Sequence, residues 1–215
     1  MTALRLQINE ETVYEGPSIA VPRVGEEIHH DGKVVRVECT LAEDEFLAVV
    51  RDADLEAIVD VRRFPGSRRN RQYSGEEMAK WLPEHGVEYR WLSSLGGRRQ
   101  PVRDSQNTGL RNEQFRAYAD HMTSDEFLDG IAELCALARI RCLAVICAES
   151  VWWRCHRRLL ADHLVLIEQM RVEHLFHDGR PAEHVPTPEA RRVDDHIVYV
   201  STSSQPASSM PASRK

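Results

Sequence analysis

An aspartate and several arginines stand where a short apolar segment of the chain ends. Residues 57–61 are apolar except for Asp60, and the Pro65-Gly66 turn that follows is flanked by Arg62, Arg63, Arg68 and Arg69. Guanidinium groups form paired hydrogen bonds with phosphate, sulfate or carboxylate. Because ligands of α/β proteins bind where the strands end, we expect these arginines to hold an anion, with Asp60 as a catalytic group. The alternative is a basic loop that faces solvent.

A cysteine ends a second apolar segment, residues 142–147, and a helical pattern follows it. A thiol in this place faces the N-terminal amides of the helix, which favour a thiolate and bound anions. We therefore predict that Cys147 is a nucleophile and that its pKa lies below the ordinary value of about 8.5. Glu149 is a candidate general acid or base. The alternatives are that Cys147 is a small buried hydrophobe and that Glu149 forms an ion pair with an arginine.

Two further groups of residues are candidates for binding the same anion. Arg154, His156 and Arg157 lie at the start of the helix after Cys147, where His156 either lines the site or has a structural role. Arg98 and Arg99 follow Gly96-Gly97 and open a long polar loop. Glycines allow the backbone to approach a ligand closely. The sequence leaves open whether this loop is a lid or a surface connection.

The composition restricts the class of protein. The net charge of the 215-residue chain is −6, so locally concentrated arginines fit a cleft for a small anion better than a broad nucleic-acid surface. An odd number of cysteines without a Cys-x-x-Cys pair or a zinc-finger spacing predicts no disulfide framework, no metal site and no cofactor. No apolar run is long enough to span a membrane and no secretory signal is recognisable, so the cytoplasm is the expected location. The oligomeric state is not indicated.

Strand and helix patterns alternate along most of the chain, which predicts an α/β fold with a largely parallel sheet flanked by helices. Residues 1–39 read as short strands, including 4–8 and 34–37, and predict a small N-terminal β appendage. Residues 40–200 form the predicted α/β domain. Residues 201–215 are rich in Ser, Pro and Ala and predict a disordered tail.

Several segments together are similar to a known family. They are Asp60–Asn70, Leu95–Arg99, Asn107–Asp120 and Cys147–Asp162, with His184 and Thr187–Arg191 near the end. Over about residues 40–192 the chain resembles the domain of unknown function 488 family. This family has no settled activity, so the resemblance implies a compact α/β domain and a shared site but no reaction. Members usually have a Gly-His pair before the first helix, where this chain has Val37-Glu38-Cys39-Thr40, so the histidine of that pair is missing here.

The sequence therefore favours an enzyme that acts on an anionic, phosphate-bearing small molecule or nucleotide. Cys147, Glu149 and Asp60 are its candidate catalytic groups, and the arginines bind the anion. A non-catalytic module that binds nucleic acid or a nucleotide through the same arginines is the first alternative. Sulfur transfer through a persulfide on Cys147 is the second.

Overall fold

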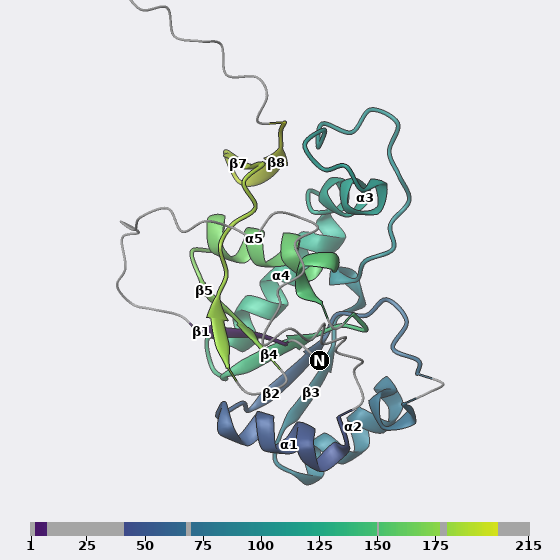
Figure 1. The fold of residues 1–215 in the computed structure, drawn as a ribbon, viewed down its shortest axis with the longest axis vertical. Coiled ribbons are helices and arrows are strands. Elements are labelled where there is room, and N and C mark those ends of the chain that lie inside the picture. Colours follow the sequence, from purple (N-terminus) through teal and green to yellow (C-terminus); the bar gives the residue numbers. More distant parts are fainter. Residues whose placement is uncertain (1–2, 8–40, 68–69, 150, 177–179, 202–215) are drawn as a thin grey trace, which may run out of the picture.

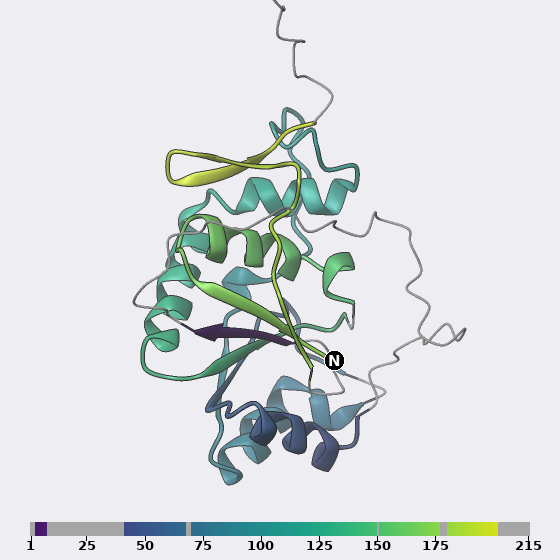
Figure 2. The same ribbon diagram turned by 60° about the vertical axis from the view of Figure 1, so that its left-hand side comes forward.

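A mixed β-sheet lies between two layers of helices (Figure 1). The computed structural model describes residues 3–7, 41–67, 70–149, 151–176 and 180–201. One face of the sheet is covered by α1 (Glu43–Asp52) and α2 (Gly75–Glu84), and the other by α4 (Asp125–Ala138) and α5 (Arg157–Leu166). Helix α3 (Glu113–His121) packs against α5, and Figure 2 shows the same layers from a second side.

Six strands form the sheet in the order β3-β2-β4-β1-β5-β6. Their bounds are Ala3–Gln7 (β1), Ala57–Asp60 (β2), Glu88–Trp91 (β3), Leu143–Ile146 (β4), Arg171–Leu175 (β5) and Pro181–Glu183 (β6). Strand β2 pairs in parallel with β3 and β4, whereas β1 is antiparallel to β4 and β5. The α/β class and the helices on both faces were predicted correctly. Parallel pairing is confined to the β3-β2-β4 part.

The first strand belongs to the main sheet. The alternating pattern at residues 4–8 predicted a strand, and β1 is that strand, but it pairs with β4 and β5 and not within a separate appendage. Residues 8–40, which contain the predicted strand at 34–37, lie outside the described residues, as does the predicted tail after Ser201. Strand β8 (His196–Tyr199) lies outside the main sheet. It forms a separate hairpin with β7 (Ala190–Val193).

Side chains alternate between two apolar cores because successive residues of a strand point to opposite faces of the sheet. Val59 and Val145 pack on the α4 and α5 side, while Ile58 and Ile146 pack on the α1 and α2 side. All four residues of β2 and of β4 are buried, as their nearly unbroken apolar runs predict.

Serine side chains cap the beginnings of α2 and α4. The hydroxyl of Ser74 accepts a hydrogen bond from the amide of Glu77 at the start of α2. At α4 the capping residue is Ser124, whose hydroxyl accepts from the amide of Phe127. Among the described residues, no helix is long and apolar enough to cross a membrane.

Candidate functional site

The two segments singled out in the sequence meet at one edge of the sheet. Asp60, the last residue of β2, is the register partner of Ile146, the last residue of β4. The amide of Val61 continues the pairing by donating to the carbonyl of Ile146 at 3.1 Å. Because the strands are parallel, the residues after Asp60 and those after Ile146 leave the sheet together. The predicted common edge is thus present.

The faces of the sheet nevertheless separate Asp60 from Cys147. Asp60 shares the face of Ile146, toward α2, whereas Cys147 belongs to the core on the α4 and α5 side. A period of two along each strand produces this separation, because adjacent positions point to opposite faces. The residues grouped by the sequence into one catalytic set are therefore divided between two sites.

Asp60 and Arg62 form a buried ion pair on the α2 side. The Arg62 Nε donates to both carboxylate oxygens of Asp60, at 2.8 and 3.0 Å, and Nη2 donates to Oδ2 at 2.5 Å. Nη1 donates to the carbonyl of Tyr73, and the hydroxyl of Tyr89 donates to Asp60 at 2.8 Å. Asp60 is 0% exposed and Arg62 is 6% exposed. The hydrogen-bonding capacity of this guanidinium is used inside the protein, which gives the pair a structural role.

A cleft of about 790 Å³ opens beside Cys147 on the other side of the edge. Its walls come from the loop after β2, the Gly96-Gly97 segment, α3, the loop after β4, and the short helix η3 (Trp152–Arg154) with the residues that follow it. The polar and sulfur-containing residues that line it are Arg62, Arg63, Arg98, Gln114, Tyr118, Cys147, Glu149, Arg154, Cys155 and His156. Asp60, Arg99 and Arg157 are not among its lining residues.

Two thiols and one imidazole form a compact cluster in this cleft. The Nδ1 atom of His156 lies 3.9 Å from the Sγ of Cys147 and 3.5 Å from the Sγ of Cys155. These three atoms all lie within 4.8 Å of one another. Cys155 was not among the candidate site residues predicted from the sequence. Cys147 directly follows β4, and Cys155 lies two residues before the start of α5. The loop between β4 and α5 therefore folds back and brings the two sulfurs together.

The two thiols lie close enough to affect each other's pKa. A hydrogen bond from Cys147, together with the positive charge of Arg157 and the nearby His156, lowers the pKa of Cys155 well below its ordinary value despite burial. The same hydrogen bond, with burial, raises the pKa of Cys147. The sequence predicted a lowered pKa for Cys147, and this was wrong. Cys155 is the thiol that accepts from the Nε of Arg157, and this positive charge favours its thiolate.

Arg157 holds the loop after β4 against the start of α5. Its side chain is 0% exposed; Nε donates to the Sγ of Cys155 at 3.5 Å, and Nη2 donates to the backbone carbonyl of Glu149. Arg157 therefore positions Cys155 and does not reach the cleft as an anion ligand. The side chain of Glu149 is exposed at the cleft.

Three arginines present exposed side chains to the cleft. Arg63, Arg98 and Arg154 are exposed, and none forms an ion pair with another residue of the described chain. Arg99, by contrast, donates to the carbonyls of Gly96, Ser93 and Ser94 and pairs with Glu126. Arg68 and Arg69 lie outside the described residues. Of the predicted anion ligands, these three remain available to bind an anion in the cleft.

A family comparison covers the segments that build the cleft. The family model described as domain of unknown function DUF488 matches residues 43–164, which is more than half of the chain. The chain belongs to this family. A comparison with curated proteins found no match, and a comparison with solved structures also found none. The matched region contains every described residue that lines the cleft, so the cleft lies within the DUF488 domain.

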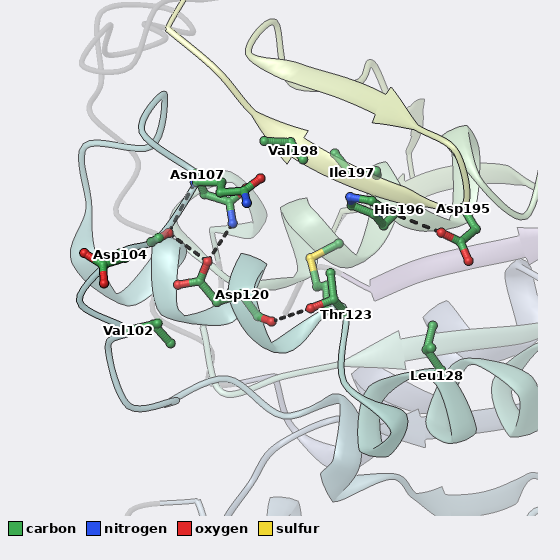
Figure 3. Close-up of a pocket in the computed structure, with 13 residues that line it drawn as sticks. Val102, Asp104, Asn107, Asp120, Thr123, Leu128, Asp195, His196, Ile197 and Val198 are labelled. Atoms are coloured by element: carbon green, nitrogen blue, oxygen red, sulfur yellow. Dashed lines mark hydrogen bonds and ion pairs between the residues drawn. The ribbon is translucent and has the colours of Figure 1, made fainter.

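The polar loop after the glycines has a structural role in this DUF488 domain. Asn107 donates from Nδ2 to Asp120 and accepts from the amide of Tyr199, and the amide of Gly109 donates to the carbonyl of Tyr199. The loop thus attaches β8 to α3. A second cavity of about 620 Å³ lies there, lined by the loop, by the end of α3 and by β8 (Figure 3). None of the candidate residues from the sequence lines this second cavity.

A buried polar chain, which the sequence did not single out as a site, lies beyond β5. Asp162 of α5 accepts from His184 at 2.9 Å and from the hydroxyl of Tyr199 at 2.9 Å. His184 in turn contacts His174 at 2.9 Å, and the ring of Trp152 stacks on His174 with centroids 3.6 Å apart. Burial is the main reason that the pKa of His174 falls to about 2. These contacts connect the C-terminal segment to α5 and to η3, which forms one wall of the cleft.

Proposed function

We propose that this DUF488 protein is an enzyme that acts on a phosphate-bearing small molecule in the cleft beside Cys147. One observation supports this most: the exposed Arg63, Arg98 and Arg154 surround the same cleft whose wall carries the cluster of Cys147, Cys155 and His156. An anion held by the arginines would lie next to polarisable sulfurs and an imidazole. Glu149 at the rim provides a group that can accept or donate a proton.

The backbone at Arg98 supports a binding role for this residue. Arg98 has φ 59°, in the left-handed region that most residues other than glycine avoid. Such strained conformations cost roughly 1–3 kcal/mol and cluster at functional sites. Here the conformation follows Gly97 and presents an exposed guanidinium at the cleft.

Aromatic side chains favour a nucleotide over a simple anion. Phe64 is 70% exposed and lines the cleft together with Phe115. Base stacking on aromatic rings contributes about 1–3 kcal/mol per base and is common in proteins that bind nucleotides. The same feature favours the second candidate function, a module that binds single-stranded nucleic acid, with Trp153 as an additional exposed ring.

Titration with three probes separates these functions. Inorganic phosphate, adenosine monophosphate and a single-stranded oligonucleotide are titrated at low and at physiological salt. We expect saturable binding of the mononucleotide and oligonucleotide binding that disappears at physiological salt, because few phosphate contacts are available. Tight binding of the oligonucleotide at physiological salt, without binding of the mononucleotide, would contradict the enzyme function. It would support the second candidate, a module that binds single-stranded nucleic acid.

Matched variants locate the anion. Arg154→Gln and Arg98→Asn remove one charge each, and asparagine tolerates the left-handed backbone at position 98. Loss of a charge-assisted hydrogen bond of about 1.5–3 kcal/mol weakens binding roughly ten- to a hundred-fold. Arg51→Gln, at an exposed arginine of α1 outside the cleft, is the control and should bind like the wild type.

Alkylation tests whether the anion lies beside the sulfur cluster. Bound mononucleotide should slow the reaction of Cys147 and Cys155 with iodoacetamide, measured by peptide mass spectrometry. Cys142, which does not line the cleft, is the internal reference. Binding that leaves both rates unchanged would mean that the arginines and the sulfurs do not form one site, which argues against the enzyme.

A further inference from the structure

The cluster of Cys147, Cys155 and His156 has the donor set of a metal site. Thiolates and a neutral imidazole are the ligands that zinc prefers among soft and borderline donors. One potential ligand atom from each residue lies within 4.8 Å of the other two, and no other described residue adds a donor to this group. Zinc sites with two cysteines and one histidine occur in enzymes, where a water or substrate takes the fourth position.

The two sulfur–nitrogen distances are close to the edges of a coordination tetrahedron. With zinc–sulfur bonds of about 2.3 Å and zinc–nitrogen bonds of about 2.0–2.1 Å, tetrahedral angles place a sulfur and a nitrogen about 3.5 Å apart and two sulfurs about 3.8 Å apart. The Nδ1 atom of His156 lies 3.5 Å from Cys155 Sγ and 3.9 Å from Cys147 Sγ. The two sulfurs also lie within 4.8 Å of each other, so an inward shift of about 1 Å or less brings all three atoms to zinc-binding separations.

A glycine keeps the space near the imidazole nitrogen open. A Cβ atom added to Gly97 would lie 2.8 Å from Nδ1 of His156 and 3.1 Å from its Cγ. Real Cβ atoms do not approach a heavy atom so closely, so any side chain at this position would displace the imidazole or fill the space beside the nitrogen. The ring of Tyr118, with its centroid 4.9 Å from that of His156, supports the imidazole from another side.

We propose that Cys147, Cys155 and His156 bind a zinc ion. Two thiolates neutralise its charge, and Arg157 stabilises the Cys155 thiolate from the second shell through its Nε–H. Because the described residues supply three donors, water or a cleft ligand completes the tetrahedron. All three donors line the cleft, so an ion bound there can polarise a phosphoryl oxygen or activate a water molecule. Binding of the ion itself does not depend on the proposed function.

Cobalt(II) and zinc(II) are the probes for this site. The full chain, stripped of metal under reducing conditions, is titrated with cobalt(II), which gives an intense thiolate charge-transfer band when two cysteines coordinate it. We expect a single ion per chain and displacement of cobalt by zinc. A titration in which no such band develops would overturn the zinc site.

Two pairs of variants assign the ligands. Cys155→Ser removes a ligand, and Cys142→Ser is its control at a half-buried cysteine outside the cleft. Gly97→Ala keeps every ligand but intrudes on His156, and Gly66→Ala is its control in the same cleft, where an added Cβ has nothing within 4 Å. Cys155→Ser and Gly97→Ala should lose the cobalt band, while the controls keep it. Equal cobalt binding by Cys155→Ser and the wild type would refute the assignment.

Two further measurements keep the outcomes distinct. In the wild type, zinc should protect Cys147 and Cys155 from alkylation relative to Cys142, which tests the site without any variant that might misfold. Arg154→Gln should weaken mononucleotide binding roughly ten- to a hundred-fold yet retain cobalt. If the wild type binds metal but no nucleotide, the zinc site is supported and the proposed function is contradicted. If it binds nucleotide but no metal, the proposed function is supported and the zinc site is contradicted.

Discussion

Replacing Arg62 by alanine should destabilise the fold and spare the cleft. The guanidinium is the main partner of a carboxylate that is 0% exposed. Without it, Asp60 keeps only the hydroxyl of Tyr89 and the amide of residue 62 as donors, and the carbonyl of Tyr73 loses its bond from Nη1. Removing one partner of a buried ion pair costs about 3–5 kcal/mol, because the remaining charge stays buried without compensation.

The loss is large against the whole stability of a domain, which is typically about 5–15 kcal/mol. For a chain of this size each kcal/mol lowers the melting temperature by about 2–4 °C, so we expect a fall of roughly 10 °C for Arg62→Ala. Calorimetry or circular dichroism measures it. The control Lys80→Ala removes an exposed ion pair with Glu76, where at most about 0.5 kcal/mol is expected.

A double variant isolates the uncompensated charge. Arg62→Met combined with Asp60→Asn removes both charges and should be more stable than Arg62→Met alone. Folded Arg62→Ala should still bind the mononucleotide, because the Arg62 guanidinium, at the wall of the cleft, is already held by Asp60 and by the carbonyl of Tyr73. An unchanged melting temperature together with lost nucleotide binding would show that Arg62 is a ligand of the anion, as the sequence had suggested.

Three other perturbations test the packing around the site. Because the pKa of His174 is lowered to about 2, the unfolded chain binds a proton between about pH 6.5 and 2 that the folded chain does not. Stability should therefore fall by about 1.4 kcal/mol per pH unit below roughly pH 6, and His174→Phe should flatten this slope in urea titrations from pH 7 to 4; parallel curves would contradict it. Tyr199→Phe removes a hydrogen bond to buried Asp162 and should cost about 1.5–3 kcal/mol by chemical denaturation, whereas a neutral result would mean that the bond is not formed. Gly130→Ala should cost about 1–3 kcal/mol despite the better helix propensity of alanine, since the new Cβ would lie 2.4 Å from the Ser94 hydroxyl; an increase in thermal stability would disprove this contact.

The sequence predicted the central strands and the helices well, because their apolar patterns are regular and continuous. The continuous apolar run before Cys147 is a strand buried on both faces, and the alternation of strands and helices gave the common edge of β2 and β4. The antiparallel position of β1 could not be foreseen, because pairing between distant strands is set by tertiary packing and not by local pattern.

The candidate site was only partly predictable. The placement of Asp60 and Cys147 on opposite faces depends on the register between β2 and β4, which alternation within a single strand does not determine. The meeting of Cys155 with Cys147 depends on the path of a loop, for which the sequence has no periodic pattern. The burial of Arg157 was equally hidden, since arginine at the start of a helix usually faces solvent.

The most direct test of the anion cleft is a crystal structure of the protein soaked with adenosine monophosphate. The cleft predicts the phosphate within hydrogen-bonding distance of Arg98 and Arg154, on the side of the sheet edge where Cys147 lies. A phosphate bound at the Asp60 and Arg62 pair, or a cleft left empty at saturating nucleotide, would contradict the central claim.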